Sequence, residues 1–166
     1  MAIETLDRSE VFQFLRPDQV KTISDVAEAV SYRAGETVYS KGAPADHFYI
    51  VLEGQVSLRL PGHRGVSIQI DELTAGAIFG SCVCFQLIQY SLDAQCTRDS
   101  RLLKISSTTL KELMERDLVL GFAIQTQISR IYFQRYIETM NKLQSIVMNL
   151  PLEPAERESS RVAVGV

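Results

Sequence analysis

The sequence predicts a mainly β fold with flanking helices. The expected core is an antiparallel jelly-roll (double-stranded β-helix) barrel, with short N-terminal helices before it and a long C-terminal dimerisation helix after it. Seven of the nine glycines lie between residues 35 and 80, and each closes a short run of β-branched or aromatic residues. This spacing is typical of strands joined by tight turns. On both sides of the region, apolar residues recur every three or four positions, as they do in helices.

The first thirty residues are predicted to be helical. Ser9 is a suitable N-cap for a helix over residues 10–15, and Pro17 suits the first turn of a second helix. The apolar residues that extend this second helix at helical spacing are Val20, Ile23, Val26, Ala27 and Val30.

From Ser31 the hydrophobic period changes to two, which indicates strands. At least six short strands at this rhythm predict a small jelly roll or barrel. The predicted strands cover residues 31–33, 37–40, 47–52, 55–60, 66–73 and 101–105.

After Ile105 the period lengthens again. Ser106 or Ser107 is expected to cap a helix over residues 108–115, and a long helix follows over residues 117–150. At 1.5 Å per residue the long helix would span ~50 Å, which is more than a small barrel can cover. A parallel coiled coil with a second copy would bury the excess apolar stripe. The alternative is that the helix folds back on its own barrel.

These elements divide the chain into three parts. Residues 1–116 form the predicted barrel domain with its short helices, and residues 117–150 form the helix that would make a homodimer. Residues 151–166 contain two prolines and mixed charge without an apolar stripe, so we expect a disordered tail. Within the long helix, the step from Ile131 to Ile137 breaks the three-or-four spacing.

The composition narrows the range of functions. The 166 residues carry a net charge of −3, which gives no general attraction to nucleic acid or to anionic lipid. No apolar run approaches the ~20 residues of a membrane span. From the charge and the missing apolar run together, we expect neither direct DNA binding nor membrane association. Three cysteines cannot pair fully, and a reducing cytoplasm is the simplest location.

Catalytic chemistry has little support in the sequence. Two isolated histidines, His47 and His63, do not have the spacing of a metal site, and no nucleophile motif is present. The cysteines, at positions 82, 84 and 96, are interpreted as core residues. We therefore expect no metal, no cofactor and no enzymatic activity.

The chain resembles the cyclic-nucleotide-binding domain, and in particular the effector domain of bacterial regulators of the catabolite-activator/FNR type. The resemblance extends over about residues 11–143. Family regulators continue into a helix-turn-helix domain, which residues 151–166 cannot form, so the sequence is interpreted as an isolated regulatory domain or a fragment. The matching segments are residues 14–15 (Phe-Leu), 34–39 (Ala-Gly-Glu-Thr-Val-Tyr), 41–42 (Lys-Gly), 47–56 (His-Phe-Tyr-Ile-Val-Leu-Glu-Gly-Gln-Val), 73–76 (Leu-Thr-Ala-Gly) and 79–80 (Phe-Gly).

The resemblance implies a phosphate-binding cassette that begins Phe-Gly-Glu and ends Arg-Ser/Thr-Ala. Here Ser81 stands in place of the glutamate that would bind the ribose, and Tyr90 stands in place of the arginine that would bind the phosphate. Residues 79–97 contain no lysine or arginine and a single acid, Asp93. A buried phosphate without a cation keeps a large desolvation cost, so we expect weak binding of cyclic AMP.

The predicted function is therefore a non-catalytic regulatory module that senses an unknown small-molecule effector through a degenerate cassette. One alternative is a dimeric interaction scaffold without a ligand, which has filled the cassette with Tyr90 and Phe85 and binds a protein partner. Another is a true cyclic-nucleotide binder that uses Arg130 or Arg135 from the long helix. The predicted ligand-binding residues are Phe79, Gly80, Ser81, Cys82, Val83, Tyr90, Ser91, Leu92, Ile131 and Arg135.

Two groups of residues are expected to shape this site. Ser81, Tyr90 and Ser91 would offer neutral hydrogen bonds. A charged and aromatic stretch of the long helix is interpreted as a lid contributed across the dimer. The alternatives are a face that stacks on nucleic-acid bases and, more simply, a solvent-exposed helix face. The apolar residues of the cassette are Cys82, Val83, Cys84, Phe85, Leu87 and Ile88, and the lid residues are Arg130, Tyr132, Phe133, Arg135 and Tyr136.

Overall fold

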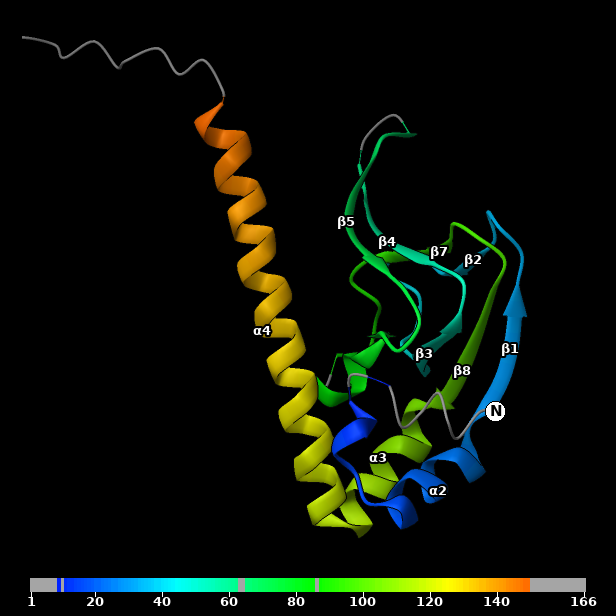
Figure 1. The fold of residues 1–166 in the computed structure, drawn as a ribbon. Coiled ribbons are helices and arrows are strands. Elements are labelled where there is room, and N and C mark those ends of the chain that lie inside the picture. Colours follow the sequence, from blue (N-terminus) through cyan, green and yellow to red (C-terminus); the bar gives the residue numbers. More distant parts are fainter. Residues whose placement is uncertain (1–8, 10, 63–64, 86, 150–166) are drawn as a thin grey trace, which may run out of the picture.

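A computed structural model describes residues 9, 11–62, 65–85 and 87–149. A barrel of two antiparallel sheets has short helices at one end and a long helix along one side (Figure 1). The strands are β1 Glu28–Tyr32, β2 Thr37–Tyr39, β3 His47–Glu53, β4 Val56–Pro61, β5 Ser67–Leu73, β6 Ile78–Phe79, β7 Asp93–Cys96 and β8 Ser100–Ser106. The helices are the 3₁₀ turns η1 Phe12–Phe14 and η3 Ser81–Phe85 and the α-helices α2 Pro17–Val26, α3 Ser107–Arg116 and α4 Leu118–Met148.

The strands form two four-stranded sheets, in the orders β1-β8-β3-β6 and β2-β7-β4-β5. The predicted mainly β, jelly-roll architecture is confirmed, and the expected strands are present with ends that differ by at most three residues. The strands β6 and β7 were not predicted. Both are short, and each pairs with a longer strand, β6 with β3 and β7 with β4.

The hydrophobic core has two layers, and β3 contributes to both. Its side chains alternate between the faces of the sheet. Phe48 and Ile50 face the helices, where they belong to the same cluster as Ile124 of α4. Tyr49 and Val51 face the second sheet and belong to the cluster that fills the barrel.

The N-terminal helices are shorter than predicted. Ser9 does accept a hydrogen bond from the backbone N–H of Phe12, at 3.0 Å, but only a single 3₁₀ turn follows. Pro17 begins α2 as expected, whereas Val30 lies in β1 rather than in a helix. The helical spacing fails there because β1 pairs along its whole length with β8, and this sheet pairing outweighs the local pattern.

The caps of the C-terminal helices follow the sequence closely. The Ser106 hydroxyl accepts a hydrogen bond from the backbone N–H of Thr109, at 3.5 Å. Asp117 Oδ1 accepts from the backbone N–H groups of Val119 and Leu120, both at 3.0 Å, and these bonds begin α4. The 31 residues of α4 agree with the predicted long helix, although Leu150 and the tail lie outside the described residues. The division of the chain at residues 116 and 150 stays a prediction.

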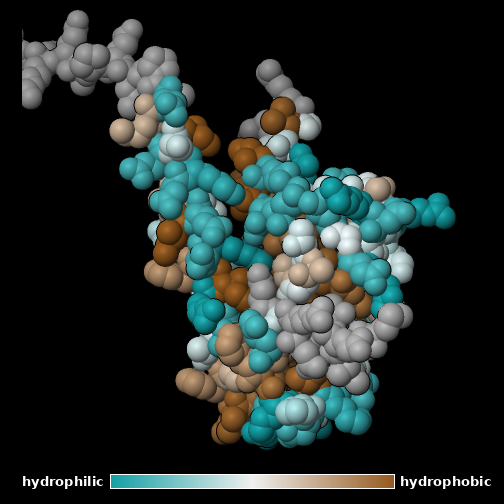
Figure 2. Space-filling view, in the orientation of Figure 1, coloured by the Kyte–Doolittle hydropathy of each residue, from teal (hydrophilic) through white to brown (hydrophobic). Residues whose placement is uncertain are grey.

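Helix α4 has two apolar faces, which explains the register break seen in the sequence. Near its start, Leu120, Ile124 and Ile128 are buried against the barrel and the short helices. Further along, a second stripe at alternating steps of three and four residues is exposed, and it appears as brown and tan patches on the helix in Figure 2. We call Phe133, Tyr136, Met140, Leu143 and Val147 the exposed stripe.

The base of α4 is closely packed. An ideal Cβ on Gly121 would lie 2.6 Å from the carbonyl oxygen of Met114 in α3, so only glycine permits this approach of the two helices. From this base α4 runs along the barrel to the level of the β4–β5 hairpin (Figure 1). No described helix combines the length and the apolar character that a bilayer-spanning segment requires.

Candidate ligand pocket between the barrel and the long helix

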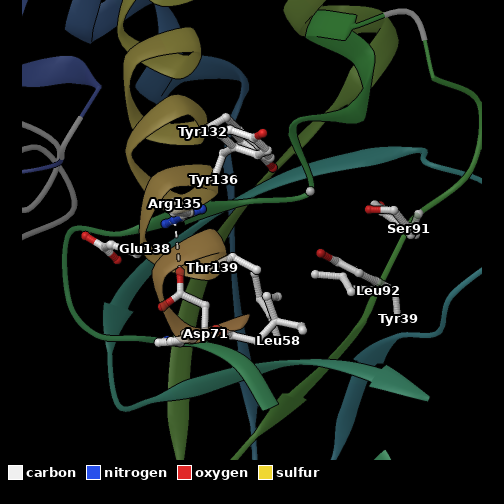
Figure 3. Close-up of a pocket in the computed structure, with 14 residues that line it drawn as sticks. Tyr39, Leu58, Asp71, Ser91, Leu92, Tyr132, Arg135, Tyr136, Glu138 and Thr139 are labelled. Atoms are coloured by element: carbon white, nitrogen blue, oxygen red, sulfur yellow. Dashed lines mark hydrogen bonds and ion pairs between the residues drawn. The ribbon is translucent and has the colours of Figure 1, made fainter. Parts of the chain in front are cut away.

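A cavity of about 260 Å³ lies between the second sheet and α4, beside the segment that follows η3 (Figure 3). Strands β2, β4 and β5 supply its barrel side, the segment around Tyr90 supplies one edge, and α4 supplies the facing wall. The residues that line it are Tyr39, Leu58, Ile70, Asp71, Gly80, Tyr90, Ser91, Leu92, Tyr132, Arg135, Tyr136, Glu138, Thr139 and Lys142.

Gly80 positions the start of the cassette. Its φ of +72° lies in the left-handed region, and an ideal Cβ would lie 2.8 Å from the carbonyl oxygen of His47. Glycine alone therefore fits without strain. Phe79, predicted to bind ligand, is instead a core residue with no exposed surface, because its ring stacks on that of Tyr49 at a centroid distance of 5.0 Å.

Ser81 is also turned away from the cavity. It is fully buried, and its hydroxyl hydrogen-bonds the hydroxyl of Tyr132 on α4 at 2.7 Å. The residue that stands in place of the family glutamate thus ties η3 to the long helix rather than facing a ligand. The side chains of Cys82 and Val83 lie outside the described part of the molecule.

Tyr90 replaces the cassette arginine with an aromatic wall. Its hydroxyl donates to the carbonyl oxygen of His47 at 2.8 Å and accepts from the His47 N–H at 3.1 Å, so this polar end is used by the barrel. Its ring stacks on Tyr39 with centroids 3.6 Å apart. The expected hydrogen bond from Tyr90 to a ligand is therefore replaced by a flat apolar surface. Ser91 and Leu92 lie beside it (Figure 3).

The apolar cassette residues whose side chains the structure describes do not line the cavity as expected. Leu87 and Ile88 are exposed, because the backbone there pairs with the segment before β3 and turns both side chains outward. Cys84 packs against the helical core cluster. Phe85 is partly exposed and meets the ring of Tyr132 edge-on at 5.2 Å.

Arg135 brings a cation into the cavity from the chain's own helix. Its Nε lies 3.0 Å from Oδ2 of Asp71 on β5, and Nη1 donates to the carbonyl oxygen of Ile78 at 3.1 Å. Its guanidinium also lies 5.7 Å from the centre of the Tyr132 ring. The Arg135 and Asp71 side chains are 17% and 26% exposed, so the ion pair is largely shielded from water.

The other residues of the predicted lid divide between faces of α4. Tyr132, Arg135 and Tyr136 line the cavity of their own chain, so the wall they form does not require a second copy. Arg130 lies over the ring of Phe14 in a neighbouring hollow, and Phe133 is exposed. Ile131 packs on the helical core cluster, one helix face away from the cavity, because it continues the buried row of α4.

The charges around the cavity balance. Its described lining holds two cations, Arg135 and Lys142, and two carboxylates, Asp71 and Glu138. The Lys142 ammonium donates to the carbonyl oxygen of Ile70 at 3.3 Å. Glu138 points away from Leu92 and Tyr39, on the far side of the Arg135–Asp71 pair (Figure 3). A ligand in this cavity would therefore meet no net charge.

The remaining titratable groups near the barrel have structural roles. Burial raises the pKa of the Cys96 thiol, which disfavours the reactive thiolate. Burial likewise raises the pKa of Tyr49 far above its ordinary value. In the described residues, no group of three His, Cys, Asp or Glu side chains is arranged to hold a metal ion.

Several lining residues were missed by the sequence analysis, although a signal for some was present. Thr139 and Lys142 were missed, although they continue at helical spacing the face of α4 that carries the predicted lid residues Tyr132, Arg135 and Tyr136. Asp71 is the first charged residue of β5, after four uncharged residues, and Glu72 follows it. Tyr39, Leu58 and Ile70 give no comparable signal, because strand residues on a core face look alike in sequence.

Comparison with known proteins gives consistent results. A family model described as "Cyclic nucleotide-binding domain" matches residues 29–117. The "CRP-like cAMP-activated global transcriptional regulator" of Mycobacterium tuberculosis is 24% identical over 153 residues, which are 87% of this chain and 62% of that protein. The chain thus spans less than two thirds of the length of this curated relative.

Solved structures share the fold. A cyclic nucleotide-binding domain from Methylobacillus flagellatus matches with a TM-score of 0.76 and 15% identity, over 91% of this chain and 85% of that one. The catabolite activator protein of Thermus thermophilus matches with a TM-score of 0.70 and 22% identity, over 84% of this chain and 63% of that one. At these identities the likeness is one of fold.

Proposed function

The chain belongs to the cyclic nucleotide-binding domain family, and from that premise we propose that it is a non-catalytic regulatory module that senses a small molecule in the pocket between its barrel and α4. The ligand would be uncharged overall and at least partly aromatic, and cyclic AMP would bind weakly. Binding would be read out as a change in the position of α4, which forms one wall of the pocket. Such a switch requires the ligand to bind two positions of the helix with different affinity.

The observation that carries this proposal is that the cavity is open. A scaffold that had lost its ligand would be expected to fill the site with Tyr90 and Phe85. Tyr90 does pack against Tyr39, but Phe85 lies near the surface against Tyr132, and about 260 Å³ remains. This volume is close to the lower end for small-molecule sites, which favours a small ligand over an empty scaffold.

The chemistry of the walls supports an uncharged ligand. The stacked rings of Tyr39 and Tyr90, together with Leu58 and Leu92, offer flat and apolar contact. The cassette offers no cation to a phosphate, and the charge of Arg135 is already met by Asp71. A lost charge-assisted hydrogen bond costs about 1.5–3 kcal/mol, or roughly 10–150-fold in affinity.

A second candidate function is cyclic-nucleotide binding through Arg135. The placement of this guanidinium at the pocket wall favours it, since the cation missing from the cassette is supplied by another element. The two candidates differ in what Arg135 does when ligand is present: it stays paired with Asp71 in the first, and it binds phosphate in the second.

The exposed stripe of α4 supports a second copy of the chain as a partner. Phe133, Met140 and Leu143 are each at least 43% exposed, and they recur at the spacing of a coiled-coil seam. Tyr136 belongs both to this stripe and to the pocket lining. In a homodimer, the interface and the ligand would therefore share one side chain.

Two measurements on the full chain test the proposal. Native mass spectrometry of the purified protein should show a dimer, with a retained small molecule that is released on denaturation. Calorimetric titration with cyclic AMP and cyclic GMP should show no micromolar binding. Micromolar binding that is lost in Arg135→Gln would instead support the second candidate.

A thermal-shift screen of neutral aromatic compounds, repeated on two variants of α4, tests whether a ligand binds in this pocket. A ligand stabilises the fold that binds it in proportion to the logarithm of its concentration. The stabilisation should disappear in Thr139→Trp, which fills the pocket from α4, and should persist in Asn141→Trp, which is exposed on the same helix. Equal loss in both variants, or no stabilising compound, would contradict the proposal.

A further inference from the structure

The Asp71 side chain reaches the pocket through an irregularity in the pairing of β4 and β5. Asp71 lies opposite Leu58, whereas Gln69 lies opposite Arg59, so Ile70 is an extra residue on β5. An extra residue of this kind bends a strand and redirects its side chains. As a result Ile70 and Asp71, which are adjacent in the chain, both line the cavity.

The Asp71 carboxylate meets the pocket cation directly. Its Oδ2 lies 3.0 Å from Arg135 Nε, and the dashed line in Figure 3 joins the two groups. The guanidinium also donates a hydrogen bond to the Ile78 carbonyl oxygen and lies over the Tyr132 ring. These contacts fix the position of Arg135, and the carboxylate that pairs with it comes from the protein rather than from a ligand.

We propose that Asp71 determines the charge of the ligand by occupying the position on the Arg135 guanidinium that an anionic ligand would take. The inference rests on the proposed function, since it concerns the same pocket. A phosphate or carboxylate that approached Arg135 would come close to the Asp71 carboxylate, and the two like charges would repel. To bind, it would have to displace Asp71 and leave that carboxylate partly buried and unpaired, which is strongly unfavourable.

The charged groups that face this pair are few. Lys142 donates to the backbone of Ile70, and Glu138 points away from the cavity centre (Figure 3). The selection against anions therefore depends on Asp71, and its removal is expected to change the preference of the pocket.

The substitution Asp71→Asn tests this directly. Asparagine keeps the shape of the side chain and an oxygen that accepts from Arg135, but it removes the negative charge. Cyclic AMP serves as the anionic probe and adenosine as the uncharged probe with the same base. In calorimetric titrations, we expect Asp71→Asn to bind cyclic AMP at least about tenfold more tightly than the unaltered chain does. The affinity for adenosine should be the same in both proteins.

Two further variants define the mechanism. Glu72→Gln removes the neighbouring carboxylate of β5, which lies outside the pocket lining, and should leave the affinity for cyclic AMP within about twofold. Adding Arg135→Gln to Asp71→Asn should abolish the gain. The gain should also shrink as salt is raised, because the new contact is electrostatic. If Asp71→Asn does not fold by circular dichroism, Asp71→Ser provides the same removal of charge.

The inference is overturned if the folded variants bind cyclic AMP no more tightly than the unaltered chain, or not detectably at all. It is also overturned if Glu72→Gln gives an equal gain, since the effect would then be one of net charge. These results are separable from the proposed function: a retained neutral molecule with no effect of Asp71→Asn supports that function and refutes this inference. Tighter binding of cyclic AMP by Asp71→Asn, with no neutral ligand found for the unaltered chain, would support this inference and count against the proposed function.

Discussion

Replacement of Gly80 by alanine should destabilise the protein through two separate effects. The residue has a φ of +72°, where a non-glycine residue costs about 1–2 kcal/mol. The new methyl group would also lie 2.8 Å from the His47 carbonyl oxygen, a backbone atom of β3 that cannot move without disturbing the sheet. Overpacking of this kind typically costs about 1–3 kcal/mol. Together these effects predict a loss of about 2–5 kcal/mol in the free energy of unfolding.

Gly35 provides a matched control. Its φ is +88°, but an ideal Cβ there meets nothing within 4 Å, so Gly35→Ala should incur only the backbone cost of about 1–2 kcal/mol. Urea denaturation followed by far-ultraviolet circular dichroism measures both variants, since the chain has no tryptophan to report by fluorescence. If Gly80→Ala is no less stable than Gly35→Ala, the close approach of Gly80 to β3 does not govern this turn.

Three further predictions concern α4 and the barrel. If the chain forms the proposed homodimer, Leu143→Glu should convert it to a monomer in sedimentation experiments, whereas Gln144→Glu, one residue away, should not; a dimer in both would exclude the exposed stripe as the interface. Tyr132→Phe leaves the buried Ser81 hydroxyl without its partner and should lower the free energy of unfolding by about 1–3 kcal/mol, and an unchanged urea midpoint would contradict this role. The pKa of His47 lies below its ordinary value of 6.5, mainly because the side chain is partly buried and to a smaller extent because Lys104 is positively charged. The unfolded chain therefore binds the proton more readily, so stability should decrease as the pH falls through 6.5 toward the folded pKa, and His47→Gln should flatten this dependence.

The fold was largely predictable because turns and caps are encoded locally. Gly42 and Gly54, for example, have positive φ angles, and a period of two between such glycines identifies strands. Asp117 marked the start of α4 for a similarly local reason. β7, by contrast, alternates polar Asp93 and Gln95 with buried Ala94 and Cys96, but four residues are too few to indicate a strand by themselves. It is a strand because β2 and β4 lie on either side of it.

The candidate site was less accessible from the sequence. Gly80, Tyr90, Ser91, Leu92 and Arg135 line the cavity, and their role in ligand binding stays a prediction. The sequence showed that Tyr90 stands in place of the family arginine. It could not show that the Tyr90 hydroxyl would hydrogen-bond the backbone of His47 rather than a ligand.

The partner of Arg135 was equally hidden. Asp71 comes within 3.0 Å of Arg135 only because the barrel brings β5 against α4, which is separated from it by more than forty residues of chain. Contacts of this kind depend on tertiary structure, and a single sequence carries no local signal for them.

The close contact at Gly121 gives α4 the mechanics of a lever. With its fulcrum fixed against α3, the helix passes the pocket at Arg135 after 14 residues, about 21 Å, and reaches Met148 after 27 residues, about 40 Å. A rigid rod on this fulcrum doubles a sideways push, so a 1 Å shift at the pocket becomes about 2 Å at the tip. In the proposed sensing function, the C-terminal end of α4 is therefore the place where a ligand too small to reorganise the barrel would produce its largest displacement.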